Sequence, residues 1–181
     1  QRVVTLSIDT RGGEKPIIFR EGFWKDRNGG WAGKPVKLEL FQKAFISARF
    51  GFIHETTGGR RYRETMLYVG RKNGKSTLLS GLALYCLIAD KEAGAEVYSV
   101  ASKKDQARII YEEVCNMVRQ SPELLDITQT RKSDLYCPLT FSKMQPLGRN
   151  IHHLDGLPSY QVVIVALHTV QTPKTSPVTI P

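Results

Sequence analysis

Apolar residues recur at helical spacing in some parts of the chain and form short continuous runs in others. These two patterns predict its helices and strands. Between residues 38 and 52 the apolar positions recur near helical spacing, which predicts a helix that ends at Gly51. A long apolar stretch that begins at Ser76 predicts a second helix. Residues 103–120 carry their apolar side chains on one helical face, which predicts a third helix that Ser121-Pro122 ends.

Compact apolar runs rich in strand-forming residues lie between these helices. They cover residues 65–69, 95–101 and 161–167. Two short segments around Pro138 and Pro146 predict a hairpin between residues 135 and 147. Because strands alternate with helices, the chain is predicted to be an α/β protein with a mostly parallel central sheet flanked by helices.

The two ends of the chain have no clear period. Residues 1–35 contain Gly12-Gly13, Pro16 and further breakers among aromatic residues, which predicts an irregular arm that packs by its aromatic side chains. Residues 169–181 lose all pattern, and three of the nine prolines fall in the last nine residues, so a loose tail is expected. The expected organisation is an arm (1–35), one domain (36–168) and a tail (169–181).

Composition narrows the class of protein. A chain of 181 residues with 41% hydrophobic and 24% charged residues is typical of one globular domain. The longest apolar stretch, residues 78–89, is too short to span a bilayer. Three widely spaced cysteines exclude a disulfide framework and favour a reducing compartment, and no signal peptide is recognisable at the start, so a cytoplasmic protein is expected.

The charge is positive and uneven. The formal net charge is +9, and residues 1–90 contain 16 Lys and Arg against 8 Asp and Glu. Such an excess favours a polyanionic partner, either nucleic acid or nucleotide phosphates, although a solvated basic surface would give the same count.

One short segment has the residue types of a phosphate-binding loop, and it stands between a predicted strand and a predicted helix. A phosphate loop needs small residues that expose backbone N–H groups, a Lys for the phosphate charge and a hydroxyl for Mg²⁺. The strict motif has Gly six residues before the Lys, where this chain has Val69, so the alternative is a basic turn that joins a strand to a helix. The segment reads Gly70-Arg71-Lys72-Asn73-Gly74-Lys75-Ser76-Thr77.

This segment resembles the deviant phosphate loop of the large terminase subunits of tailed bacteriophages, in which an Arg sits near the start. Three other stretches agree in order and spacing. Residues 38–43 are similar to the family's adenine-contacting segment, residues 97–107 to its second strand and following helix, and residues 154–158 to the turn before the Walker B strand. The resemblance spans about residues 36–168 and implies a P-loop NTPase of the ASCE type, incomplete at its C-terminal end and without the family's nuclease domain.

The resemblance implies roles for individual residues. Lys75 would hold the β- and γ-phosphates of ATP, Arg71 would act beside it in catalysis, and Ser76 would bind Mg²⁺. Gln42 would contact adenine, whereas a single Gln on a helix is ordinarily a surface residue. Lys75 and Ser76 would also suit an ordinary helix start. The rest of the nucleotide-binding set is Gly70, Lys72, Asn73, Gly74 and Thr77.

The chain departs from the family at the end of its last predicted strand. Val165 stands where the family has the Asp that holds Mg²⁺, and Ala166 where it has the catalytic Glu. No Asp or Glu follows Asp155. Neither Val nor Ala can hold a metal or accept a proton, so the chain is expected to bind ATP and to hydrolyse it poorly.

The function expected from the resemblance is the ATPase portion of the motor that packages double-stranded DNA into procapsids. Its implied partners are DNA, a small terminase subunit, a portal protein and further copies in a ring, in the cytoplasm of the bacterial host and with no membrane. The alternative is a catalytically silent nucleotide- or DNA-binding prophage remnant. A different P-loop enzyme, such as a helicase or kinase, is disfavoured by Arg71 and by the missing first Gly.

Other candidate residues have simpler explanations. Arg60, Arg61 and Arg63 form a basic cluster that would suit DNA phosphates or a solvated loop equally. His152-His153 with Cys137 match no structural zinc spacing. Cys86 lies in an apolar segment, which predicts a core position.

Overall fold

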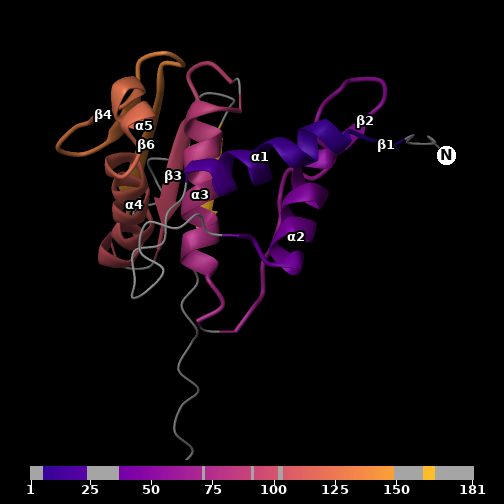
Figure 1. Cartoon of the computed structure of the whole chain (residues 1–181), viewed down its shortest axis with the longest axis horizontal. Helices are drawn as coiled ribbons and strands as arrows, with labels where there is room; N and C mark the ends of the chain where they lie inside the picture. The colour runs from indigo at the N-terminus through magenta and orange to yellow at the C-terminus, as the bar shows by residue number, and fades with distance from the viewer. Residues whose placement is uncertain are drawn as a thin grey trace, which may run out of the picture.

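The computed structural model describes residues 6–23, 37–70, 72–90, 92–101, 104–148 and 161–165. Helices and strands alternate over most of this part of the chain (Figure 1). The elements are β1 (Leu6–Ile8), α1 (Thr10–Phe23), α2 (Leu40–Gly51), β2 (Phe52–His54), α3 (Lys75–Ile88), β3 (Glu96–Val100), α4 (Lys104–Arg119), α5 (Pro122–Ile127), β4 (Gln129–Thr130), β5 (Leu135–Cys137), β6 (Ser142–Leu147) and β7 (Gln161–Val165).

Within the described part of the chain, the main sheet has five strands in the order β4-β5-β6-β3-β7. β3 runs parallel to both β6 and β7, whereas β5 is antiparallel to β4 and to β6. The expectation of a mostly parallel sheet is therefore wrong: the sheet is mixed. The physical reason is the hairpin at residues 135–147, because a short turn can join only antiparallel strands. The predicted hairpin itself is confirmed.

The core lies between β3 and the helices α3 and α4. All five residues of β3 are buried, as expected of a strand with partners on both sides. α3 is apolar almost all round, and Leu78, Leu84 and Leu87 are nearly inaccessible to solvent. α4 instead buries one stripe that includes Ile110 and Val114. The three predicted helices and the strands at 95–101 and 161–167 are thus confirmed within one or two residues at most boundaries.

A two-stranded sheet and the helix α1 connect the N-terminal segment to α2. β1 pairs antiparallel with β2, and α1 packs against both α2 and α3 (Figure 1). A Cβ on Gly13 would lie 3.4 Å from the Cα of Gly51, so the two glycines let α1 and α2 approach closely. Phe19 of α1 meets Tyr85 of α3 edge to face at 5.6 Å between ring centroids.

The expectation of an irregular stretch over residues 1–35 is wrong for the part that the structure describes. Gly13 and Pro16, which the local pattern indicates as helix breakers, lie inside α1 and are buried. Packing against α2 outweighs their low helix propensity. The predicted contribution of aromatic packing is confirmed for Phe19 and Phe23, whose rings are 4.9 Å apart, while Trp24 and Trp31 lie outside the described residues.

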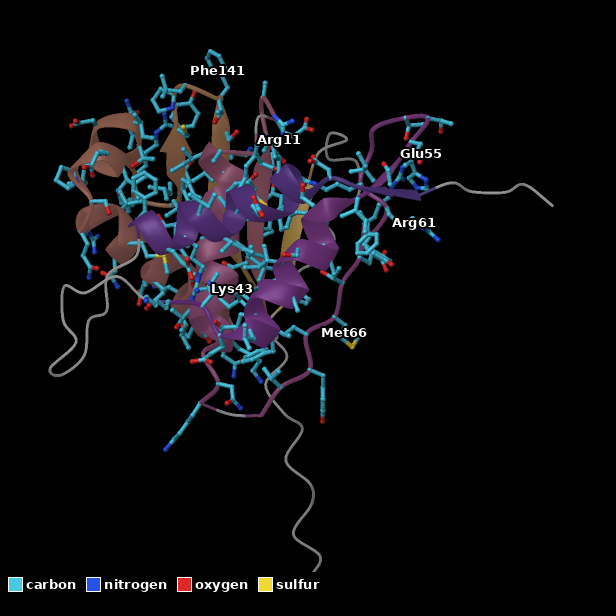
Figure 2. All side chains as sticks on the ribbon, turned by 45° about the vertical axis from the view of Figure 1, so that its right-hand side comes forward. Arg11, Lys43, Glu55, Arg61, Met66 and Phe141 are labelled. Carbon is cyan, nitrogen blue, oxygen red and sulfur yellow. The ribbon has the colours of Figure 1, made fainter. Side chains whose placement is uncertain are left out.

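The predicted strand at residues 65–69 is also wrong. These residues have no strand conformation, and Met66 and Tyr68 are 83% and 93% exposed. Figure 2 shows the Met66 side chain projecting away from the helices. A strand needs a neighbour for its backbone hydrogen bonds, and no strand of the described chain pairs with this run or with the outer edge of β7.

Several further predictions fall outside the described residues, among them the turn at 154–158 and the tail at 169–181. Among the helices that the structure describes, none combines the length and the apolar character required to cross a bilayer.

Candidate functional site

Residues 70–74 lead directly into the N-terminus of α3. Lys72 and Gly74 have positive φ angles of 65° and 67°. Gly74 is the N-cap of α3, where its missing side chain permits the left-handed backbone at little cost. The Leu78 N–H donates to the Gly74 carbonyl at 2.8 Å and starts the helical ladder. Gly74 therefore fixes where α3 begins and makes Lys75 its first residue.

The Lys75 side chain folds back over the segment that precedes it. Its Nζ donates a hydrogen bond to the Val69 carbonyl oxygen at 2.9 Å. Lys75 is partly buried, and the first turn of α3 contains no acidic residue. A cation and the positive end of the helix dipole therefore lie together at this helix end, which favours an anion.

The other predicted loop residues remain accessible. The side-chain nitrogen of Asn73 lies 3.1 Å from the position of a Cβ on Gly70, so the segment curls on itself. Thr77 is partly buried, and Arg71 lies outside the described residues. The exposed members are Gly70, Lys72, Asn73, Gly74 and Ser76.

Gln42 is brought to this loop from α2. The residue is 6% exposed, and its Oε1 accepts a hydrogen bond from the Glu39 backbone N–H at 3.1 Å. Its Nε2 lies 3.3 Å from where a Cβ on Gly74 would stand. Gln42 thus lies beside the loop as a buried residue of the helix start and not as the surface residue of the alternative interpretation. Its predicted contact with adenine stays a prediction.

The positions where the resemblance would place an acidic pair lie at the end of β7, which pairs with β3, the neighbour of β6. Val165 stands in register with Val100, at the carboxyl ends of two parallel strands. Val165 is the last residue of β7, and Ala166 lies outside the described residues. Among the described residues no group of three or more His, Cys, Asp or Glu side chains could hold a metal ion.

Comparison with known proteins decides the family. Residues 40–175, three quarters of the chain, match the family model for the terminase large subunit, ATPase domain. The chain belongs to the large terminase subunit family. The matched region contains Gln42, the 70–77 segment and β7.

Two comparisons with a bacteriophage protein agree with this assignment. The large terminase subunit of Enterobacteria phage HK97 is 29% identical over 151 residues, which cover 80% of this chain and 29% of that protein. The crystal structure of the HK97 bacteriophage large terminase is similar with a TM-score of 0.69 and 22% identity, over 85% of this chain and 37% of that one. The chain therefore spans about a third of the length of the relatives that it matches.

In this terminase domain the three arginines of the basic cluster lie in two different environments. Arg60 forms a bidentate ion pair with Asp90, whose side chain is 1% exposed, and its guanidinium lies 4.6 Å from the Phe50 ring centroid. Arg61 and Arg63 are exposed. Arg60 therefore holds the loop after β2 against the end of α3, which neither of the two interpretations of this cluster, DNA contact or a solvated loop, had anticipated.

The sequence pattern gives no sign of a role for Glu21, because this residue lies in the stretch predicted to be irregular. Its Oε1 accepts a hydrogen bond from the Leu38 N–H at 3.0 Å and forms an ion pair with Lys43 Nζ at 2.9 Å. The bond from Lys43, followed by the one from Leu38, lowers the pKa of Glu21. Nothing in the local pattern indicates this link, because Glu21 and Lys43 lie on different helices.

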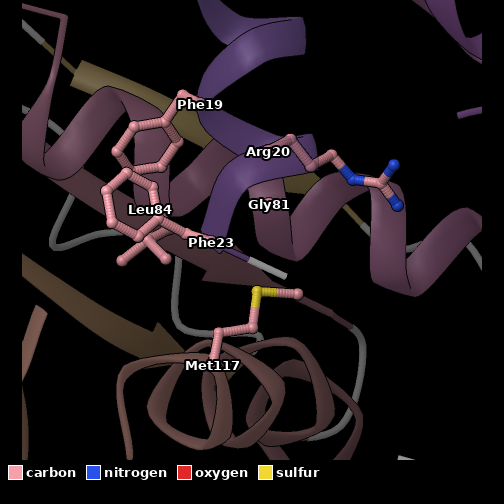
Figure 3. A pocket seen from close by; sticks show the side chains of 6 residues that line it. All are labelled: Phe19, Arg20, Phe23, Gly81, Leu84 and Met117. Atoms are coloured by element: carbon pink, nitrogen blue, oxygen red, sulfur yellow. The ribbon is translucent and has the colours of Figure 1, made fainter. Parts of the chain in front are cut away.

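A small hollow between α1, α3 and α4 lies apart from the loop. In Figure 3 the Arg20 guanidinium points away from Leu84 and Met117. Burial lowers the pKa of Arg20 to about 9, which leaves it cationic at neutral pH. The lining is otherwise apolar and offers no nucleophile or general base. The residues that line it are Phe19, Arg20, Phe23, Gly81, Leu84 and Met117.

The cysteines have structural positions. Cys86, Cys115 and Cys137 are free and buried, and burial raises the pKa of the Cys86 thiol to about 12, so the predicted core position of Cys86 is confirmed. His152 and His153 lie outside the described residues.

Proposed function

We propose that this chain binds ATP through residues 70–77 and serves as the ATPase portion of a DNA-packaging terminase. The observation that carries the proposal is the placement of Lys75 at the amino end of α3, inside the matched family region and behind a turn with two positive-φ residues. A helix start with a cation and no acidic residue in its first turn suits the triphosphate of a nucleotide.

The residues present fit a triphosphate group. Lys75 would exchange its bond to the Val69 carbonyl for phosphate oxygens, because a charged acceptor binds an ammonium more strongly than a neutral one does. Lys72 adds a second, exposed cation, and Asn73 an amide donor. Gly70, Gly74 and Thr77 would line the loop, and Arg71 would act on the phosphates as the resemblance implies.

The fit to Mg²⁺ is partial. Ser76 is exposed in the first turn of α3 and would supply a hydroxyl ligand. When bound, Mg²⁺ neutralises phosphate charge, and it ordinarily takes one or two carboxylates besides phosphate oxygens and water. At the end of β7 this chain has Val165 where the family places such a carboxylate. We therefore infer that ATP binds and that its hydrolysis is slow.

The lack of a carboxylate at Val165 also favours a second candidate, a catalytically silent nucleotide- or DNA-binding prophage remnant. The two candidates differ in turnover, since the remnant would not hydrolyse ATP whether it binds nucleotide or DNA. Double-stranded DNA, a small terminase subunit, a portal protein and further copies in a ring are the partners that the family suggests, and the host cytoplasm is the place. Mg·ATP binding and Mg·ATP hydrolysis measured on one preparation separate the two candidates. Binding with turnover above background supports the motor, whereas binding without turnover supports the remnant.

A further inference from the structure

Guanidinium groups gather on aromatic rings beside β2. The Cζ atoms of Arg49 and Arg60 lie 5.4 and 4.6 Å from the centroid of the Phe50 ring. The Cζ atom of Arg61 lies 6.0 Å from the centroid of the Tyr62 ring. The face of an aromatic ring attracts a cation and stacks well on a planar guanidinium. The rings therefore hold several positive charges in one small region of the surface, although like charges repel one another.

The loop after β2 that carries these arginines has a fixed backbone. The Arg61 N–H donates to the Phe52 carbonyl at 2.8 Å. Arg49 Nη2 donates to the Arg63 carbonyl oxygen at 3.5 Å. The ion pair between Arg60 and the carboxylate that follows α3 ties the loop to the end of that helix. The backbone that carries Arg61 and Arg63 is therefore held in place before any partner binds.

Arg61 and Arg63 present their side chains to solvent. Figure 2 shows Arg61 at the margin of the molecule. Glu55 and Glu64 are exposed in the same loop. Within the described chain, however, neither arginine forms an ion pair with them or with any other carboxylate. Two guanidinium groups thus remain available to an external anion.

We propose that Arg61 and Arg63 bind the phosphate backbone of a nucleic-acid duplex. A guanidinium offers paired N–H donors that match the oxygens of a phosphate. Thr56 and Thr57, at the exposed tip of the loop, add hydroxyl donors, which commonly contact phosphates. Gly58 has open space around its Cβ position and lets a backbone approach closely. A surface of this kind holds a duplex in place without reading its sequence.

Two carboxylates of the loop weaken its attraction for DNA at a distance. Glu55 and Glu64 offset the charge of the two exposed arginines, so the loop has no broad positive field. Binding then depends on close contact between guanidinium and phosphate, where hydrogen bonds add to the attraction of charge.

This surface is separate from the proposed nucleotide site. Asp90, which pairs with Arg60, lies just after the carboxyl end of α3, whereas Lys75 is the first residue of that helix. A helix of 14 residues is about 21 Å long. The inference deepens the proposed function, since it assigns a surface to the DNA among its partners, yet Mg·ATP binding does not depend on it.

Fluorescence anisotropy of a short labelled DNA duplex over a series of salt concentrations tests the surface. The parent chain is compared with the double variant Arg61→Ala/Arg63→Ala. The control is Arg108→Ala/Arg119→Ala, which removes the same charge from exposed positions of α4. The loss of two phosphate contacts should weaken duplex binding at least about tenfold and lower the salt slope by about two. The control should stay close to the parent in both respects.

Equal losses in the two double variants would overturn the inference, because binding would then follow net charge alone. Absence of duplex binding by the parent at low salt would also overturn it, and Mg·ATP titration of the same preparation shows whether the proposed nucleotide site stands. Poly-glutamate is the competitor for a different class of partner. If it displaces the labelled duplex as effectively as unlabelled duplex does, the surface accepts any acidic chain and the assignment to nucleic acid is wrong.

Two further variants keep the test independent of folding. Arg61→Lys/Arg63→Lys retains both charges and should keep the salt slope of the parent, and a slope as low as that of the alanine variant would contradict the inference. Glu55→Gln/Glu64→Gln should bind the duplex more tightly than the parent. Unchanged or weaker binding would contradict the placement of the duplex at this loop. If Arg61→Ala/Arg63→Ala does not fold, these two variants carry the test.

Discussion

The ammonium of Lys75 lies 2.9 Å from the carbonyl oxygen of Val69, six residues earlier in the chain. This hydrogen bond joins the two ends of the segment 69–75, which leads into α3. It also holds the cation at the amino end of the helix, where the helix dipole would assist an anionic ligand. A phosphate group that enters the loop would compete with the Val69 carbonyl for the same ammonium.

Gly74→Ala is expected to lower the free energy of unfolding by about 1–2 kcal/mol, because Ala is strained in a left-handed backbone. The new Cβ would also lie 3.3 Å from Gln42 Nε2 and displace it. Gly58→Ala is the matched control: Gly58 has a similar φ of 65° and open space around it. Denaturant unfolding should show a loss in both variants, whereas only Gly74→Ala should also weaken nucleotide binding. Equal binding by the two variants would argue against a role for Gly74 in the loop.

Arg60→Ala is expected to destabilise the fold by about 3 kcal/mol, because it leaves the buried Asp90 carboxylate without its ion-pair partner. Arg61→Ala, next in sequence and exposed, should stay within about 0.5 kcal/mol of the parent. Thermal unfolding of the two variants measures the difference. Similar melting temperatures would show that the Arg60–Asp90 pair does not hold the loop.

Stability is expected to fall on acidification through Glu21 and Glu96. Lys43 and Leu38 lower the pKa of Glu21, and Lys143 and Tyr98 lower that of Glu96. A carboxylate with a lowered folded-state pKa contributes its full stabilisation above the unfolded value of about 4.3, and loses it as the pH falls through the folded-state value. Urea unfolding between pH 3 and 6, a range chosen around that value, should therefore show a shallower loss in Glu96→Gln than in the parent. Glu112→Gln, which removes an exposed carboxylate of α4, should follow the parent curve; a parent curve that is flat over this range would contradict the assignment.

Val165→Asp combined with Ala166→Glu is expected to raise ATP turnover, by roughly 100-fold if the new Glu accepts the proton of the attacking water. Val165→Asn with Ala166→Gln is the control, since it has the same size and lacks the charge. Steady-state phosphate release compares the two. Equal rates would mean that these positions do not complete the catalytic site.

Helices were predictable from the sequence where the apolar period is strong, as in α4, whose buried Ile110 and Val114 belong to one stripe. The helix α1 was not predictable from the sequence, because Gly13 and Pro16 are poor helix formers in isolation. The contact of α1 with α2 stabilises the helix at these residues. The run at 65–69 has strand-forming residues, yet pairing depends on a neighbour that local pattern does not supply.

The site was predictable in part. The loop and Gln42 were named from the resemblance, and the structure places Gln42 beside Gly74, while their nucleotide contacts stay predictions. The anchoring of α2 by Glu21 and the capture of Arg60 by Asp90 could not be foreseen, since each joins residues more than 15 positions apart on different elements.

The most direct test of the nucleotide site is the affinity for Mg·ATP of the parent chain and of Lys75→Ala, measured by isothermal titration at physiological ionic strength. Removal of a cation that binds phosphate should weaken ATP at least about tenfold, since the bond of a charged group contributes about 1.5–3 kcal/mol. Lys132→Ala, an exposed lysine between β4 and β5, should match the parent. Saturable binding by the parent with this loss in Lys75→Ala is the predicted result. No binding by the parent, or equal affinity in the parent and Lys75→Ala, would contradict the account.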